Sequence, residues 1–109
     1  MPKGEKRIGV SYVIAYGPNS STEMVETTVL AEKCGFYSSF IPEHYYDRES
    51  PSIIGAMSQR TSKLRIGTSV INPYTRYPSL VAMTAATLDE LSHGRAFLGL
   101  GSGGVEVRI

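Results

Sequence analysis

The run of residues 42–47, Pro-Glu-His-Tyr-Tyr-Asp, places an acid, an imidazole, two phenols and a second acid side by side. His44 is the candidate general acid or base, because an imidazole exchanges its proton near neutral pH, and Glu43 stands directly beside it. The alternative interpretation is a surface histidine in a polar loop. The run follows a predicted strand, and parallel α/β folds carry their chemistry at strand carboxyl ends, which favours a site.

A second candidate segment is rich in glycine. Residues 99–104, Gly-Leu-Gly-Ser-Gly-Gly, follow another predicted strand and satisfy the pattern G-x-G-x-x-G. A dinucleotide site also requires a helix directly after the turn and an acidic residue about 20 positions later, and neither can be checked in a sequence that runs to Ile109. The segment alone indicates either a turn that permits positive φ or a place where a flat ring or a phosphate approaches the backbone.

The strand predicted over residues 63–71 contains an irregularity. Gly67 lies inside it, and glycine within a strand often marks a bulge or a close backbone approach. We therefore expect a bulge at Ser69 and Val70, with a non-proline cis peptide bond between these two residues as a further hypothesis. The loop that follows could bind an anion or a ring, or form a solvated face, through three side chains: Tyr74, Arg76 and Tyr77.

The elements that must position these groups alternate as β-α-β-α-β-α-β. This alternation predicts a parallel sheet in the order 1-2-3-4 with all helices on one face. A doubly wound sheet and a (β/α)8 barrel share the local pattern, and a full barrel needs about 250 residues, so the chain could supply only its first half. Strands are predicted at residues 7–14, 36–41, 63–71 and 96–100. The first helix is predicted to have Ser21 or Thr22 as its N-cap and to reach Cys34, and the others to run from Pro51 to about Arg60 and from Pro78 to His93.

Two further expectations concern the helices. Gly35 suits the position after the end of the first helix, and Cys34 is interpreted as a small buried apolar residue. The third helix is expected to pack through one apolar face, made of Leu80, Val81, Ala85, Leu88 and Leu91.

Composition excludes several functional classes. The 109 residues are 41% apolar and 19% charged with a net charge of +1, which is typical of a globular domain without the basic stripe of a nucleic-acid-binding protein. No apolar run reaches the roughly 18 residues of a membrane span, and no secretory signal is evident, so the expected location is cytoplasmic. A single cysteine excludes an intramolecular disulfide framework, and the widely spaced His44 and His93 give no metal-ligand pattern.

Taken together, several segments resemble the luciferase-like monooxygenase superfamily. The resemblance spans residues 8–103, and its motifs are most similar to those of the deazaflavin-dependent methylenetetrahydromethanopterin reductase branch. It implies an α/β fold in which residues 1–109 form a single partial domain, the N-terminal half (β-α-β-α-β-α-β) of a (β/α)8 TIM barrel with parallel strands. The segments that carry it are residues 31–36, 42–44, 65–70, 72–78, 86–95 and 99–103.

The resemblance also implies a function and a set of site residues. The expected activity is hydride transfer at a cofactor ring, either the deazaflavin coenzyme F-420, as the first choice, or FMN, with oxygen chemistry in the flavin monooxygenases. Glu43 and His44 would be the catalytic pair beside the ring. Some deazaflavin dehydrogenases carry a catalytic glutamate where this chain has Gly104. The residues expected to bind the cofactor are Ser69, Val70, Asn72, Ser102 and Gly103.

Two other functional classes remain open at this stage. One is a non-catalytic half-barrel that binds a ligand or dimerises, and the other is a free-standing dinucleotide-binding domain. Four strands of an eight-stranded barrel leave two open edges and an uncovered inner face. We therefore expect a small-molecule substrate, no nucleic acid, no membrane, and either a homo-oligomer or a requirement for the other half of the barrel.

Overall fold

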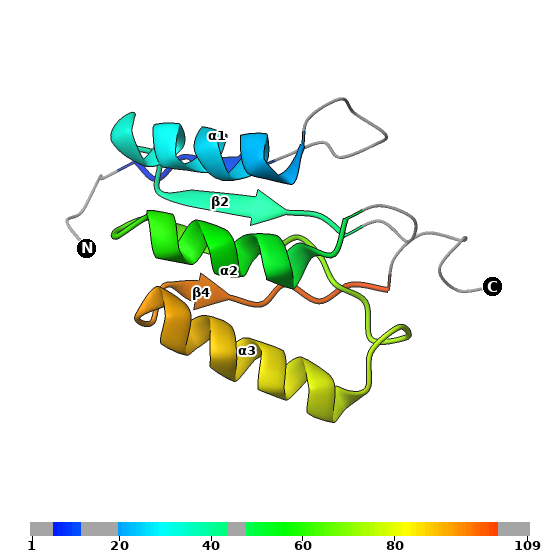
Figure 1. The fold of residues 1–109 in the computed structure, drawn as a ribbon. Helices are drawn as coiled ribbons and strands as arrows, with labels where there is room; N and C mark the ends of the chain where they lie inside the picture. The colour runs from blue at the N-terminus through cyan, green and yellow to red at the C-terminus, as the bar shows by residue number, and fades with distance from the viewer. Residues whose placement is uncertain (1–5, 12–19, 44–47, 103–109) are drawn as a thin grey trace.

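The computed structural model describes residues 6–11, 20–43 and 48–102, which form one parallel sheet covered by helices on one face (Figure 1). The strands lie in the order β1-β2-β3-β4, as predicted, and a doubly wound arrangement with helices on both faces is not found. The elements, in chain order, are β1 (Gly9–Ser11), α1 (Ser21–Lys33), β2 (Ser38–Ile41), α2 (Ser50–Arg60), β3 (Arg65–Thr68), α3 (Pro78–Ser92) and β4 (Ala96–Phe97).

The apolar core lies between the sheet and the helices. Its side chains come from the inward stripes of α1, α2 and α3 and from alternate positions of β2 and β3, as the periods of a helix and a strand require. Two aromatic side chains of neighbouring strands also pack together: the Phe40 and Phe97 rings meet edge to face with centroids 5.2 Å apart. The buried core residues are Met24, Val25, Ile41, Ile53, Ile54, Met57, Leu64, Ile66 and Leu88.

Helix α1 corrects two expectations about its ends. Its N-cap is Ser20 and not Ser21 or Thr22, because the extended Ser20 accepts a hydrogen bond from the Glu23 N–H at 3.1 Å. Cys34 is exposed and not buried, since it closes the helix at the surface, away from the inward stripe. Gly35 follows with φ of 86°, which agrees with the predicted backbone position.

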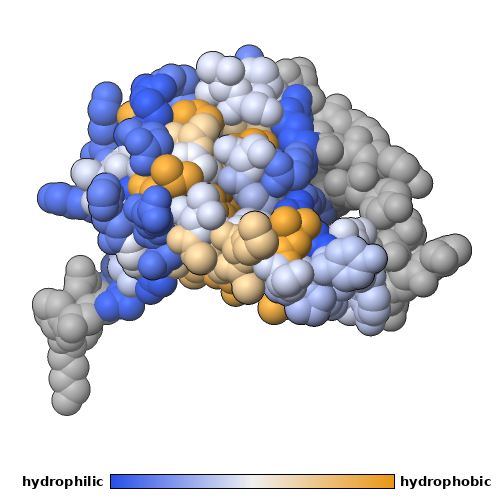
Figure 2. Space-filling view, turned by 60° about the horizontal axis from the view of Figure 1, so that its bottom comes forward, coloured by the Kyte–Doolittle hydropathy of each residue, from blue (hydrophilic) through white to orange (hydrophobic). Residues whose placement is uncertain are grey.

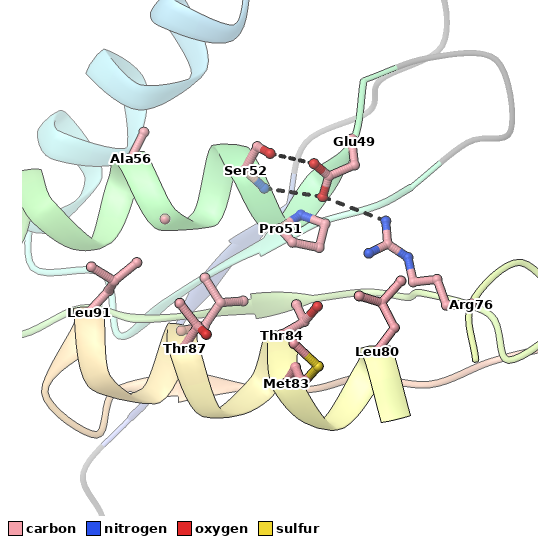
Figure 3. A pocket seen from close by; sticks show the side chains of 12 residues that line it. Glu49, Pro51, Ser52, Ala56, Arg76, Leu80, Met83, Thr84, Thr87 and Leu91 are labelled. Carbon is pink, nitrogen blue, oxygen red and sulfur yellow. Dashed lines mark hydrogen bonds and ion pairs between the residues drawn. The ribbon is translucent and has the colours of Figure 1, made fainter. Parts of the chain in front are cut away.

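Helix α3 packs through a narrower face than predicted. Leu88 is buried and Val81, Ala85 and Leu91 are half-buried, but Leu80 is 46% exposed. The reason is an open groove between α2 and α3, lined by Leu80, Leu88 and Leu91, where α2 covers this side of the helix only in part (Figure 3). Figure 2 looks toward this side of the molecule and shows apolar side chains gathered among hydrophilic ones.

The connection between α2 and β3 is held by two charged side chains at the amino edge of the sheet. Arg95 donates to the backbone oxygens of Ser58, Thr61 and Leu64 at 2.8–3.0 Å. Glu32 accepts hydrogen bonds from the Lys63 and Leu64 N–H groups at 2.8 and 2.9 Å, and from the neighbouring Ser62 N–H. The two groups satisfy backbone atoms that the turn would leave unpaired, and so fix where β3 begins.

The same hydrogen bonds set the ionisation of Glu32. Burial on its own raises the pKa of this carboxyl, but the N–H groups of Leu64, Lys63 and Ser62, with the Arg95 charge, outweigh burial. The net result is a pKa below the ordinary value of 4.5.

We expect Glu32 to contribute stability only while it is ionised. Its pKa is lower in the folded chain than in the unfolded chain, so the contribution is complete above pH 4.5 and is lost as pH falls through the folded-state pKa. The difference in unfolding free energy between wild type and Glu32→Gln should therefore be constant at neutral pH and shrink in acid. Urea unfolding at a series of pH values measures it, and a difference that grows in acid would contradict this account.

Candidate functional site

Strand β3 contains the predicted bulge where it leaves the regular sheet. Gly67 pairs with Phe97, and the next pair along the two strands is Ile71 with Leu100. From one pair to the next, the β3 segment advances by four residues and the β4 segment by three. The β3 segment thus carries one extra residue, which is the definition of a bulge. The peptide bond between Ser69 and Val70 is cis, so the bulge and the cis bond are both confirmed.

The bulge presents small polar and apolar groups at the carboxyl edge of the sheet. The Ser69 N–H remains bonded to the Ile41 oxygen at 2.9 Å, while its side chain is exposed. Val70 is half-buried, and Ser102, at the end of the chain segment that follows β4, is exposed. Neutral hydroxyls and one apolar surface therefore stand at the place where the cofactor residues were expected.

The glycines after β4 have a specific structural reason. Thr68 Oγ1 donates to the Gly99 oxygen at 2.8 Å and accepts from the Gly99 N–H at 2.9 Å. A Cβ atom at Gly99 would overlap the Thr68 carbonyl oxygen, and one at Gly101 would come within 2.6 Å of Val70 Cγ2. These two glycines let the segment after β4 approach the bulge closely, and the ring or phosphate contact considered from sequence stays a prediction.

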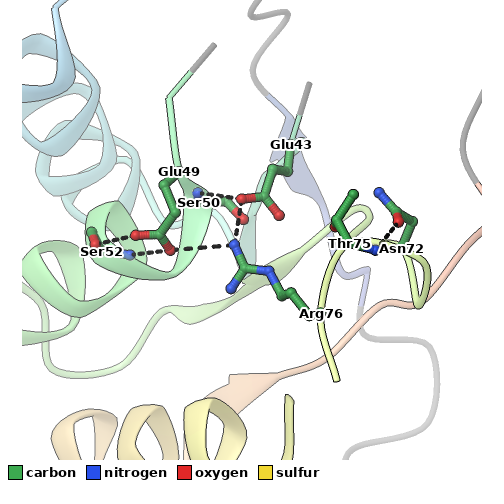
Figure 4. Close-up of polar contacts among 7 residues, drawn as sticks. All are labelled: Glu43, Glu49, Ser50, Ser52, Asn72, Thr75 and Arg76. Atoms are coloured by element: carbon green, nitrogen blue, oxygen red, sulfur yellow. Dashed lines mark hydrogen bonds and ion pairs between the residues drawn. The ribbon is translucent and has the colours of Figure 1, made fainter. Parts of the chain in front are cut away.

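Asn72 builds the loop that follows the bulge. Its buried side-chain oxygen accepts hydrogen bonds from the N–H groups of Tyr74 and Thr75, both at 3.0 Å. Figure 4 shows the contact with Thr75. The Asn72 side-chain oxygen is therefore occupied by hydrogen bonds within the loop. The predicted role of Asn72 in cofactor binding stays a prediction.

Glu43 is held by an arginine from the neighbouring loop. Arg76 Nη2 lies 2.6 Å from Glu43 Oε1, and the two side chains are 13% and 15% exposed (Figure 4). The same Glu43 oxygen receives the Ser50 N–H at 3.4 Å, and Arg76 Nη2 is 3.6 Å from Glu49 Oε1. Arg76 is thus paired with carboxylates, whereas the nearby Tyr74 and Tyr77 are 64% and 81% exposed.

The pair was not foreseen from sequence, because 33 residues separate its members. The available signal was positional: Glu43 follows β2 and Arg76 belongs to the loop after β3, and the carboxyl ends of adjacent parallel strands meet at one edge. Glu49, the N-cap of α2, likewise received no role from the sequence, although its carboxylate accepts the Ser52 N–H at 3.2 Å.

The remaining predicted site residues, His44 and Gly103, lie outside the described residues, as does Gly104. Among residues 6–11, 20–43 and 48–102, no cluster of His, Cys, Asp or Glu side chains could hold a metal ion. Within these ranges, too, no helix has the length and apolar character to cross a membrane. The groove between α2 and α3, about 630 Å³, receives Arg76 from the candidate site but none of the predicted cofactor residues.

The order of strands, the one-sided helices and the polar carboxyl edge define half of a (β/α)8 barrel of parallel strands, as expected from the sequence. Residues 8–109 match the family model described as luciferase-like monooxygenase. The chain belongs to this family.

Named relatives and solved structures refine the comparison. The chain is 42% identical over 74 residues to 5,10-methylenetetrahydromethanopterin reductase of Methanolobus tindarius, covering 68% of this chain and 23% of the relative. It is 42% identical over 90 residues to F420-dependent glucose-6-phosphate dehydrogenase of Segniliparus rotundus, covering 74% of this chain and 27% of the relative. The chain therefore spans about a quarter of the length of these curated relatives.

Among solved structures, the chain is similar to the coenzyme F420-dependent tetrahydromethanopterin reductase of Methanopyrus kandleri. The TM-score is 0.86 at 31% identity, over 95% of this chain and 29% of that one. A type II Baeyer-Villiger monooxygenase of Pseudomonas putida in complex with FMN shares the fold, with a TM-score of 0.80 at 21% identity over 90% of this chain and 30% of that one.

We expect Gly99→Ala to be strongly destabilising because the new methyl group would meet the backbone oxygen of Thr68. Overpacking of this kind costs about 1–3 kcal/mol, and here it would also disturb the Thr68 hydrogen bonds. The matched control is Gly55→Ala in α2, where the nearest atoms to the added methyl group would be 3.7 Å away and helix propensity should add about 0.5–1 kcal/mol of stability. Urea unfolding of both variants checks the contrast, and equal stabilities would contradict it.

Proposed function

We propose that the chain is part of an oxidoreductase that transfers a hydride between the deazaflavin coenzyme F-420 and a small organic substrate, with FMN as the alternative cofactor. Family membership and the 31% identity to an F420-dependent reductase, over 95% of this chain, carry the proposal. The relatives named above include a methanopterin reductase and a glucose-6-phosphate dehydrogenase, two enzymes with chemically different substrates. The cofactor is therefore the better supported half of the proposal, and the substrate stays open.

The described residues fit an uncharged flat ring at the carboxyl edge. Val70 offers a half-buried apolar surface, and Ser69 and Ser102 are exposed residues that carry hydroxyl groups. Glu43 and Arg76 neutralise each other, so neither brings an uncompensated charge to the edge. A neutral rim of this kind suits the ring of a deazaflavin or flavin.

When bound, the cofactor would supply the ring atom that gives or takes the hydride. The chain's own residues would hold and orient it: Val70 by apolar contact, and Ser69 and Ser102 by hydrogen bonds, with Asn72 and Gly103 completing the binding set. His44 would hold or accept a proton at the substrate beside the ring, with Glu43 next to it. Residues 1–109 would act as a partial domain, completed by further barrel strands in the same polypeptide or by a second copy.

We expect Ser69→Phe to reduce cofactor affinity by about tenfold or more, since a bulky side chain would occupy the space above the bulge. The experiment uses the whole protein that contains this chain and titrates F-420, and separately FMN, by isothermal titration calorimetry. Ser79→Phe, on the exposed first turn of α3, is the matched control and should bind as wild type does. A wild-type protein that binds neither cofactor would refute the proposed function.

Replacement of His44 by alanine tests the catalytic assignment. Loss of a positioned acid or base typically lowers turnover about 10²–10⁴-fold, whereas cofactor affinity should change little. Steady-state kinetics with a reducible or oxidisable substrate, together with the cofactor titration, separate the two effects. Unchanged turnover would return His44 to the interpretation of a surface histidine.

A further inference from the structure

Arg76 joins three segments of the carboxyl edge through a single nitrogen atom. Its Nη2 lies 2.6 Å from Glu43, which follows β2, and 3.6 Å from Glu49, the N-cap of α2. Arg76 itself stands one residue before Tyr77, the N-cap of α3. Figure 4 shows the guanidinium group between the two carboxylates, with the Asn72 loop on its other side.

The surroundings of this ion pair differ from those of a surface pair. Glu43 and Arg76 are 15% and 13% exposed, and the buried Ser50 hydroxyl close by has no hydrogen-bond partner among the described residues. Another Arg–Glu pair, Arg60 with Glu26, has nearly the same separation of 2.7 Å, but both of its side chains are about half exposed. Removing one partner of a buried pair leaves an uncompensated charge, whereas a surface pair contributes little.

The pair also connects the two segments that carry the candidate site residues, the segment after β2 and the loop after β3. The loop that carries Arg76 begins at the Ser69–Val70 bulge and is shaped by the Asn72 side chain, which holds the Tyr74 and Thr75 N–H groups. Glu43 lies in the segment after β2, and its carboxylate also accepts a hydrogen bond from the Ser50 N–H. The ion pair thus fixes the segment after β2 against the loop after β3.

We propose that Arg76 is a positioning residue: by holding the Glu43 carboxylate, it fixes the segment after β2 against the loop that follows the Ser69–Val70 bulge, and so tunes the affinity for a ring-shaped cofactor. The inference rests on the proposed function for the identity of that ligand. In this account Arg76 acts through Glu43, whose carboxylate its Nη2 holds, and not by contact with the ligand. Direct contact between Arg76 and an anionic group of the ligand is the competing mechanism.

The experiment compares Arg76→Gln, Arg76→Lys, Glu43→Gln and the double variant Glu43→Gln/Arg76→Gln in the whole protein. Calorimetric titration with F-420 gives the affinities. Arg76→Gln should weaken binding about tenfold, and Arg76→Lys should restore most of the loss, because a single nitrogen makes the contact. Arg60→Gln is the matched control and should leave the affinity unchanged.

The double variant decides between the two mechanisms. If Arg76 acts through Glu43, its replacement should cost less than about twofold once Glu43 is already glutamine. A full tenfold loss in that background would show that Arg76 contacts the ligand itself and would overturn the inference. An unchanged affinity in Arg76→Gln, or equal losses in Arg76→Gln and Arg76→Lys, would also overturn it.

Hydrogen exchange separates this inference from the proposed function. In the absence of ligand, Arg76→Gln should accelerate exchange of the Ser50, Tyr74 and Thr75 amides more than exchange of the Ile66 amide inside the sheet. Faster exchange in a protein that binds neither F-420 nor FMN would refute the proposed function and support the positioning role. Unchanged exchange at these amides would refute the positioning role, whatever the wild type binds.

Discussion

In a parallel sheet every strand ends at the same edge, and this constraint underlies each part of the candidate site. Because β1, β2, β3 and β4 are paired in sequence order, the segment after β2 is a direct neighbour of the segment after β3. Glu43 and Arg76 meet for that reason, although they are distant in sequence. The bulge at Ser69 and Val70 lies at this edge too, so one backbone rule brings a charged pair and a polar rim together.

The two edges of the sheet use charged side chains in different ways. At the amino edge, Arg95 and Glu32 form hydrogen bonds with backbone groups of the connection between α2 and β3, so these charged groups stabilise the fold. At the carboxyl edge, Glu43 and Arg76 bond to each other, and Ser69 at the same edge is exposed. This separation of roles is typical of barrel folds, where stability residues and site residues occupy opposite ends.

The sequence by itself determined the fold and indicated the edge of the sheet at which the candidate site lies. Alternating periods of apolar residues gave the parallel order, and Gly67 inside a strand predicted the bulge that the pairing of Ile71 with Leu100 shows. The resemblance identified the family, which the match over residues 8–109 confirms. These features are readable because they depend on local geometry and on motifs whose residues are close in the chain.

Only the tertiary structure decided which side chains are partners. Arg76 was open to several interpretations in sequence, and it became one half of an ion pair only when β2 and β3 came together. Helix α3 similarly exposes Leu80, which sequence periodicity placed on its packing face, because the surfaces that receive a helix are set by its neighbours. Gly99 is required by the carbonyl oxygen of Thr68, an atom 31 residues earlier in the chain. Periodicity carries no information about such contacts, since they depend on distances between elements and not on the spacing within one.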